Sequence, residues 1–153
     1  MYLYLYNSAN IDITSISEGI EKTFPVKVAY KGYKEVPLEA FHAERKQWYA
    51  PVLLSLLIEK PSIWIVDVDI YTNGMNFIFG LAGGGKAIVS SYRLGSIGMV
   101  GKEVTHEIGH IFGLPHCKNR CVMQFSNSLI EAIEKPSWLC NACKKKLEHK
   151  INI

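Results

Sequence analysis

The stretch GKEVTHEIGHIFGLPHC, residues 101–117, carries the pattern that decides how this chain is interpreted. His106 and His110 are four residues apart, so on a helix they lie on one face and can present two imidazole nitrogens to one ion. Gly113 permits a backbone conformation closed to other residues, which lets the chain leave the helix and bring back His116 as a third ligand. Three histidines and one open position are typical of a catalytic zinc site.

Glu107 follows the first of these histidines and has a different predicted role. It is too close to His106 to bind the same ion easily, but it can reach a water held by that ion, which is where a general base belongs. The alternative for a bare H-E-x-x-H pattern is a surface helix without metal. The full H-E-x-x-H-x-x-G-x-x-H spacing argues against it, because residue frequencies give that pattern on the order of 10⁻⁷ or less per starting position.

Four cysteines follow, as Cys117-x3-Cys121 and Cys140-x2-Cys143. This is ordinary spacing for a structural zinc site, in which four thiolates fill a tetrahedron. The alternatives are a disulfide within each pair, plain buried thiols, or Cys117 as a ligand of the first ion. The simplest assignment sends His116 to the catalytic ion and all four cysteines to a second, so we expect two zinc ions per chain.

Composition limits the remaining possibilities. A chain of 153 residues, 48% of them hydrophobic, is long enough for one well-packed domain. Its net charge of +3 is short of the clustered basicity that marks nucleic-acid binding, so we expect no nucleic-acid partner. The N-terminus lacks a basic leader and no apolar stretch is long enough to span a bilayer, so we expect a soluble, cytoplasmic protein with no membrane partner. The oligomeric state is left open.

Apolar periodicity predicts alternating strands and helices, hence an α/β (α+β) fold with a mixed sheet. The stretch GLAGGGKA, residues 80–87, lacks the final Ser or Thr of a phosphate-binding loop, so we predict a turn between strands there. Asp67 and Asp69 could form a paired carboxylate site, but a hydrogen-bonded role at a strand end is the preferred interpretation. We expect strands at 2–6, 26–30, 63–71, 76–82 and 86–94, and helices at 13–24, at 41–57 with a bend at Pro51, and around His106.

HEIGHIFGLPHCKNRCVM, residues 106–123, followed by CNAC at 140–143, resembles the archaemetzincin family of metzincin peptidases. In metzincins the extended histidine motif is followed by a methionine-containing turn beneath the metal, and Met123 is in the corresponding place. An ordinary core methionine is the alternative. The intervals from Cys117 to Cys121 and from Met123 to Cys140 are about one residue shorter than is usual in the family, which concerns loop shape more than ligand order.

The resemblance implies a metzincin-like fold, in which a mixed twisted sheet and an active-site helix precede a small C-terminal subdomain with the four-cysteine zinc site. We expect a single domain over 1–153, with an N-terminal subdomain at 1–112 and a C-terminal one at 113–153. The implied function is a zinc-dependent peptidase that cleaves a peptide or protein through a zinc-activated water, with Glu107 as general base. The alternative is a non-catalytic two-zinc scaffold that binds a peptide or nucleic acid.

The family also implies where a substrate would bind. In metzincins an edge strand lines the cleft and pairs with an extended peptide, which is recognition by strand addition. Our candidate for that strand is Phe77, Ile78, Phe79, Gly80 and Leu81. An interior strand with no substrate role is the alternative.

Overall fold

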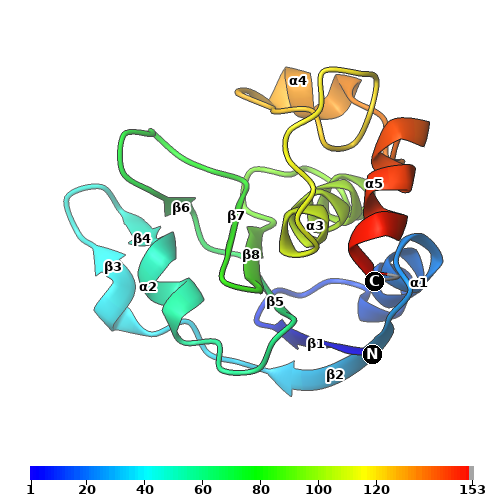
Figure 1. Ribbon diagram of the computed structural model, residues 1–153. Helices are drawn as coiled ribbons and strands as arrows, with labels where there is room; N and C mark the ends of the chain where they lie inside the picture. The colour runs from blue at the N-terminus through cyan, green and yellow to red at the C-terminus, as the bar shows by residue number, and fades with distance from the viewer. Residues whose placement is uncertain (152–153) are drawn as a thin grey trace.

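The computed structural model describes residues 1–151 and is built around a five-stranded mixed sheet with strand order β2-β1-β5-β8-β7 (Figure 1). Four strands run parallel, and β7 alone is antiparallel to its neighbour β8. Because β7 is the last strand in this order, one of its sides is an open edge. The strands are β1 (Tyr2–Asn7), β2 (Lys27–Tyr33), β5 (Ser62–Val66), β7 (Gly80–Gly83) and β8 (Lys86–Ser90).

Helices cover both faces of this sheet. On one face lie α1 (Ile13–Thr23), α3 (Ile97–Ile111) and α5 (Asn141–Ile151), and on the other lies the short α2 (Ala50–Ser55). Within β5, Ile63 and Ile65 belong to the first core, while Trp64 and Val66 belong to the second. The alternation explains why this strand reads as a continuous apolar run, as expected of a strand buried on both faces.

The strand predicted at 2–6, the helix at 13–24 and the strand at 26–30 are confirmed as β1, α1 and β2. α1 begins after Asp12, whose side chain accepts a hydrogen bond from the backbone N–H of Ser15 at 3.2 Å, a typical N-cap. Its apolar stripe buries Ile16 and Ile20 against the sheet and α3. The helix ends at Thr23, just before the Pro25 that was predicted to stop it.

Two predictions upstream of the zinc motif are wrong. The expected helix over 41–57 is helical only in α2, and the residues before it form the strands β3 (Phe41–His42) and β4 (Gln47–Tyr49). The expected strand over 63–71 is interrupted after β5, and its end, β6 (Ile70–Tyr71), joins β3 and β4 in a second sheet of order β3-β4-β6. Phe41 and Trp48 pair directly across β3 and β4, with ring centroids 4.5 Å apart. A hairpin therefore accounts for the apolar spacing that suggested a helix.

The glycine stretch is a tight turn between strands, as predicted. Gly84 and Gly85 have φ angles of 61° and 79°, so this two-residue turn uses the left-handed backbone region at both central positions. The turn joins β7 to β8 directly, and no helix follows it to form a phosphate cradle.

The chain after α3 forms the small α4 (Leu129–Glu134) and then α5, which lies beside α1 (Figure 1). Lys102 of α3 fixes α4 in place, because its Nζ donates to the carbonyl oxygens of Ala132 (3.0 Å), Ile133 (3.0 Å) and Lys135 (2.7 Å) at the C-terminal end of that helix. A single 3-10 turn (Leu38–Ala40) precedes β3. Among residues 1–151, no helix combines the length and apolarity needed to cross a bilayer.

Candidate metal centres and active-site cleft

Three imidazoles converge at the C-terminal half of α3. His106 and His110 lie one turn apart on that helix, and their Nε2 atoms are 3.2 Å apart. His116 returns to them because Gly113, two residues after the end of α3, has a φ of 89° and turns the chain back. The N–H groups of Gly113 and Leu114 donate to the carbonyls of His110 and Gly109, both at 2.9 Å, which closes this helix end.

The hydrogen bonds of the helical pair decide which nitrogens can bind a metal. The Nδ1 of His106 lies 2.8 Å from the carbonyl oxygen of Val122, and the Nδ1 of His110 lies 2.7 Å from that of Leu114. A carbonyl oxygen can only accept, so each Nδ1 carries the proton and each Nε2 keeps its lone pair. Such backing by carbonyls is the usual way in which metal-binding histidines are held in one orientation.

The geometry and the protonation of this site fit zinc. Zn–N bonds of about 2.0–2.1 Å in a tetrahedron place two ligand nitrogens about 3.4 Å apart. One ligand nitrogen from each of His106, His110 and His116 lies within 4.8 Å of the others. Burial lowers the pKa of His106 to about 4 and also lowers the pKa of His116, so both rings are neutral near pH 7, as metal binding requires.

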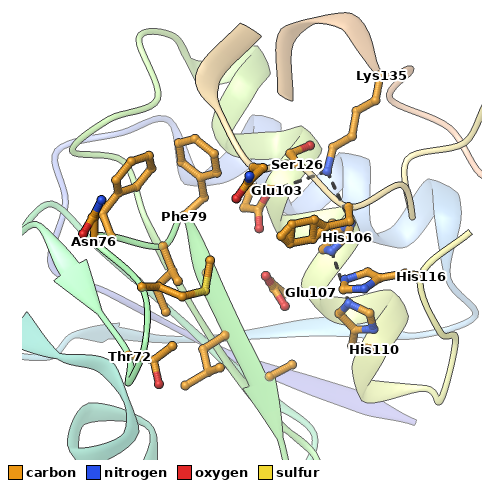
Figure 2. Close-up of a pocket in the computed structure, with 18 of the residues that line it drawn as sticks. Thr72, Asn76, Phe79, Glu103, His106, Glu107, His110, His116, Ser126 and Lys135 are labelled. Atoms are coloured by element: carbon orange, nitrogen blue, oxygen red, sulfur yellow. Dashed lines mark hydrogen bonds and ion pairs between the residues drawn. The ribbon is translucent and has the colours of Figure 1, made fainter. Parts of the chain in front are cut away.

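Glu107 lies at the floor of the cleft beside His106 (Figure 2). It is 4% exposed, and burial, followed by the charge of the neighbouring Glu103, raises its pKa well above the usual range for a glutamate. A raised pKa suits a carboxylate that takes up a proton near neutral pH and passes it on. The strand β7 packs directly against it, and a β-carbon at Gly80 would lie 2.7 Å from the Glu107 Oε2.

A buried ion pair lies behind these groups and was not predicted from the sequence. The Nζ of Lys135 is 3.9 Å from the Oε2 of Glu103, with side chains only 2% and 7% exposed. Lys135 also donates to the carbonyl oxygen of Gln124 at 3.2 Å. Glu103 precedes Glu107 by one helical turn, so the spacing could have placed it on the same face of α3. Nothing in the sequence around Lys135 indicates its position.

Met123 packs under α3, where a metzincin methionine turn is expected. Its side chain is fully buried, and its Sδ would lie 2.5 Å from a β-carbon at Gly109, the residue before the second histidine. The turn itself is closed by the N–H of Gln124, which donates to the carbonyl of Cys121 at 3.1 Å. Cys117 then donates its N–H to the carbonyl of Met123 at 3.0 Å, which links the turn to the cysteine cluster.

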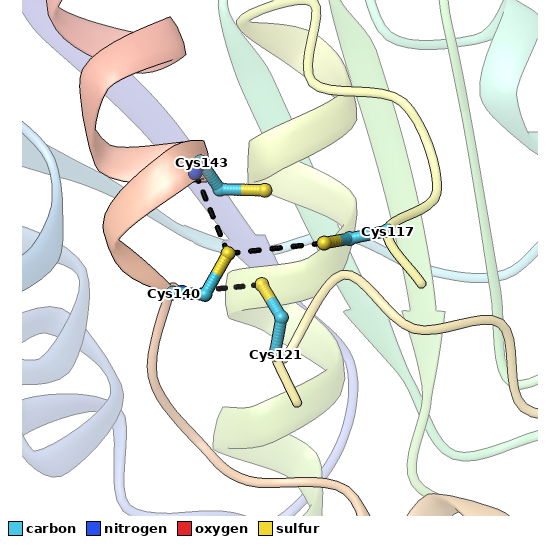
Figure 3. A group of neighbouring side chains, drawn as sticks. All are labelled: Cys117, Cys121, Cys140 and Cys143. Atoms are coloured by element: carbon cyan, nitrogen blue, oxygen red, sulfur yellow. Dashed lines mark hydrogen bonds between the residues drawn. The ribbon is translucent and has the colours of Figure 1, made fainter. Parts of the chain in front are cut away.

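The four cysteines form a second cluster (Figure 3). All four are free thiols rather than disulfides, and their Sγ atoms lie within 4.8 Å of one another. The Sγ atoms of Cys117 and Cys140 are 3.8 Å apart, which matches the separation of about 3.8 Å between two sulfurs bound at about 2.3 Å in a tetrahedron. Backbone N–H groups of Met123 and Cys140 point at the Sγ of Cys121, at 3.4 and 3.3 Å. Such donors stabilise a metal-bound thiolate.

A cleft of about 590 Å³ lies between α3 and the segment that leads into β7. The candidate substrate strand lies along it, but regular strand structure begins at Gly80 and covers only the last part of the predicted segment 77–81. The strand is at the edge of the sheet and not in its interior. The carbonyl of Phe79 accepts from the N–H of Ser90 at 2.9 Å, and in an antiparallel ladder the backbone groups of Gly80 and Ala82 then point to the open edge.

Asp67 and Asp69 do not form a carboxylate pair. Asp67 is exposed, whereas Asp69 is buried and accepts two hydrogen bonds from Arg93, both at 2.8 Å. This agrees with the hydrogen-bonded role preferred for Asp69.

Comparison with known proteins relates this architecture to one family. The model of peptidase family M54 matches residues 54–149. An archaemetzincin from Nanoarchaeum equitans is 41% identical over 152 residues, which cover 96% of this chain and 89% of the relative.

Solved structures agree with this similarity. The crystal structure of an archaemetzincin from Methanopyrus kandleri superimposes with a TM-score of 0.89 at 30% identity and covers 100% of this chain and 96% of its own. That of the archaemetzincin from Archaeoglobus fulgidus, complexed with malonate, gives a TM-score of 0.85 at 34% identity over 95% of this chain and 99% of its own.

Proposed function

The chain belongs to peptidase family M54, the archaemetzincins, and is a zinc metallopeptidase; from this premise we propose that His106, His110 and His116 hold the catalytic zinc and that Glu107 is the general base. One observation carries the proposal. Three imidazoles with free lone pairs meet beside a buried carboxylate in a cleft bordered by an open strand edge. A purely structural site needs neither the carboxylate nor the cleft.

A zinc ion held in this way supplies Lewis acidity, which acidifies a water and polarises the peptide carbonyl. Glu107 accepts the proton of the attacking water and delivers it to the leaving nitrogen, so that the peptide bond ends as a carboxylate and a free amine. Its raised pKa makes Glu107 a stronger base toward that water. The carbonyls of Val122 and Leu114 keep His106 and His110 in the required tautomer throughout.

The peptide substrate, we propose, binds along β7. The unpaired backbone groups of Gly80 and Ala82 would add it to the sheet as a further strand. Since the Cα of Gly80 is next to Glu107, a peptide paired at this point would have its reacting carbonyl close to the base.

A second zinc ion, bound by Cys117, Cys121, Cys140 and Cys143, would have a structural role, because four thiolates leave no open position. It would hold the segment after Gly113 as a unit and keep Met123 under α3. We accordingly propose an N-terminal subdomain at 1–112 and a C-terminal one at 113–153 within one domain.

The test is a turnover assay on Glu107→Gln beside the parent protein at equal zinc content. The amide keeps the shape of the side chain but cannot take a proton, so peptide hydrolysis should fall by about 10²–10⁴-fold. Glu18→Gln, on the exposed face of α1, is the matched control and should keep full activity. Activity that survives Glu107→Gln unchanged would come from a contaminant or from another base, and the assignment would be wrong.

A further inference from the structure

The wall of the cleft opposite α3 is formed by residues 72–79, which connect β6 to β7. In Figure 2, Thr72, Asn76 and Phe79 lie on the side of the cleft that faces His106 and His116. This wall belongs to no part of the zinc motif. Its shape therefore depends on whatever holds the connecting segment.

A polar network holds it from behind. Arg45 donates through Nη2 to the carbonyls of Met75 and Asn76, at 2.9 and 3.2 Å, and Gln47 donates to the same Asn76 carbonyl at 2.8 Å. Gln47 also donates to Asp69 at 3.0 Å. Asp69 is only 8% exposed, so this carboxylate is a buried centre on which the network depends.

Asp69 also supports the wall by holding Arg93 against the ring of Phe77. It binds the guanidinium of Arg93 at two points, both at 2.8 Å, and this fork leaves the guanidinium little freedom. The Arg93 Cζ lies 4.1 Å from the centre of the Phe77 ring. Phe77 in turn meets Phe79 edge-on, with centroids 5.3 Å apart. The Phe77 ring is thus clamped between a cation and a second aromatic ring.

This wall carries no charged side chain. The ionisable residues that line the cleft are all on α3 or in the segments after it. The lining residues between 72 and 82 include no ionisable side chain. Met75, Phe77, Ile78, Phe79 and Leu81 make the wall largely apolar. Phe77 precedes Gly80 by three residues, so along an extended chain it lies at most about 10 Å from the point nearest to Glu107.

We propose that Phe77 is a specificity-determining residue, which binds a large apolar side chain of the substrate within about three residues of the cleaved bond. Asp69 and Arg93 are positioning residues that act through it. This inference rests on the proposed function only in taking the cleft as the peptide site. It adds a substrate class, which is extended peptides with a leucine or phenylalanine near the cleavage point rather than an acidic residue.

The experiment uses an end-capped nonapeptide of alternating alanine and serine, in which each position in turn is replaced by leucine or by aspartate. For the zinc-loaded parent, one position should favour leucine over aspartate by about tenfold or more in kcat/KM, a difference of 1.4 kcal/mol. Phe77→Ala and Arg93→Ala should each reduce this ratio to about threefold or less through a rise in KM, with kcat preserved. Asp69→Asn should have a smaller effect of the same kind. Lys27→Ala, on the far edge of the sheet, should leave the ratio unchanged.

Loss of kcat or of zinc without loss of the ratio would show that these residues only support the fold, and would overturn the proposal. If the parent cleaves none of the peptides, binding of the same set to zinc-loaded Glu107→Gln protein is measured by fluorescence anisotropy. A leucine preference that depends on Phe77 would then support the subsite while the proposed catalytic function fails. Binding without preference, or no binding, would reject the subsite as well.

Discussion

Gly80 lies directly against the side chain of Glu107: a β-carbon on Gly80 would lie 2.7 Å from the Oε2 of Glu107 and 2.8 Å from its Cγ. The edge strand can therefore approach the base only because residue 80 has no side chain. The contact brings the substrate edge and the proposed proton carrier together, although the two residues belong to different elements far apart in the sequence.

Gly80→Ala should reduce kcat by at least about tenfold, because the methyl group moves the carboxylate away from the reacting water. Zinc content should stay unchanged, since none of the three histidines is touched. Gly83→Ala in the same strand is the matched control, because its nearest neighbour would be Leu54 Cδ2 at 3.9 Å. Equal activity of the two variants would show that the Glu107 position is not limited by this contact.

Gly109→Ala should destabilise the fold by about 1–3 kcal/mol, since the new methyl group overpacks against Met123. Gly101→Ala on the same helix has its nearest contact at 3.8 Å and should instead stabilise by about 0.5–1 kcal/mol, because alanine is the better helix former. Denaturant unfolding measures both effects. In a Met123→Ala background the penalty of Gly109→Ala should disappear, and a penalty that persists would place the strain elsewhere.

The histidine site should hold zinc on mild acidification. The lowered pKa of His106, about 4, leaves only about 1% of its rings protonated at pH 6, against about three quarters for an ordinary imidazole. Protons therefore compete less with zinc for His106. Burial also lowers the pKa of His116, which acts in the same direction. From pH 7 to 6, apparent zinc affinity at this site should fall by clearly less than the roughly 30-fold that three ordinary imidazoles would lose. Competition with a chromophoric chelator measures the zinc affinity at each pH. A loss near 30-fold would show that burial does not lower the pKa of these histidines.

Cys143→Ser should remove one zinc ion per chain and cost several kcal/mol of stability, because metal-binding energy at a closed cysteine site contributes directly to folding. The turn at Met123 should loosen with it, since Cys117 and Met123 are joined by a backbone hydrogen bond. Elemental analysis and thermal unfolding follow both effects. Lys144→Ala, at an exposed neighbouring position, is the control. An unchanged zinc content in Cys143→Ser would show that Cys143 is not a zinc ligand.

Sequence alone predicted the parts of the site that local geometry controls. The helical repeat places His106 and His110 on one face, and a left-handed glycine at 113 is the reason that His116 can return. The strand and helix at the N-terminus follow from equally local periodicity, as does the buried strand β5.

What sequence missed depends on long-range contacts. Periodicity does not distinguish a helix from a hairpin when Phe41 and Trp48 are cross-strand partners. It gives no sign that the connection after β5 bends so that Asp69 can bind Gln47 and Arg93. Lys135 lies beside Glu103 for the same kind of reason, because the end of α4 is folded back onto α3.

The two proposed zinc sites are tested most directly by anomalous diffraction at the zinc absorption edge, on crystals of the parent protein grown with zinc. Two peaks are expected in each chain, one bound by the Nε2 atoms of His106 and His110 with a ring nitrogen of His116, and one by the four cysteine sulfurs. A cysteine peak alone, with the histidines empty at saturating zinc, would contradict the assignment of the catalytic centre to α3.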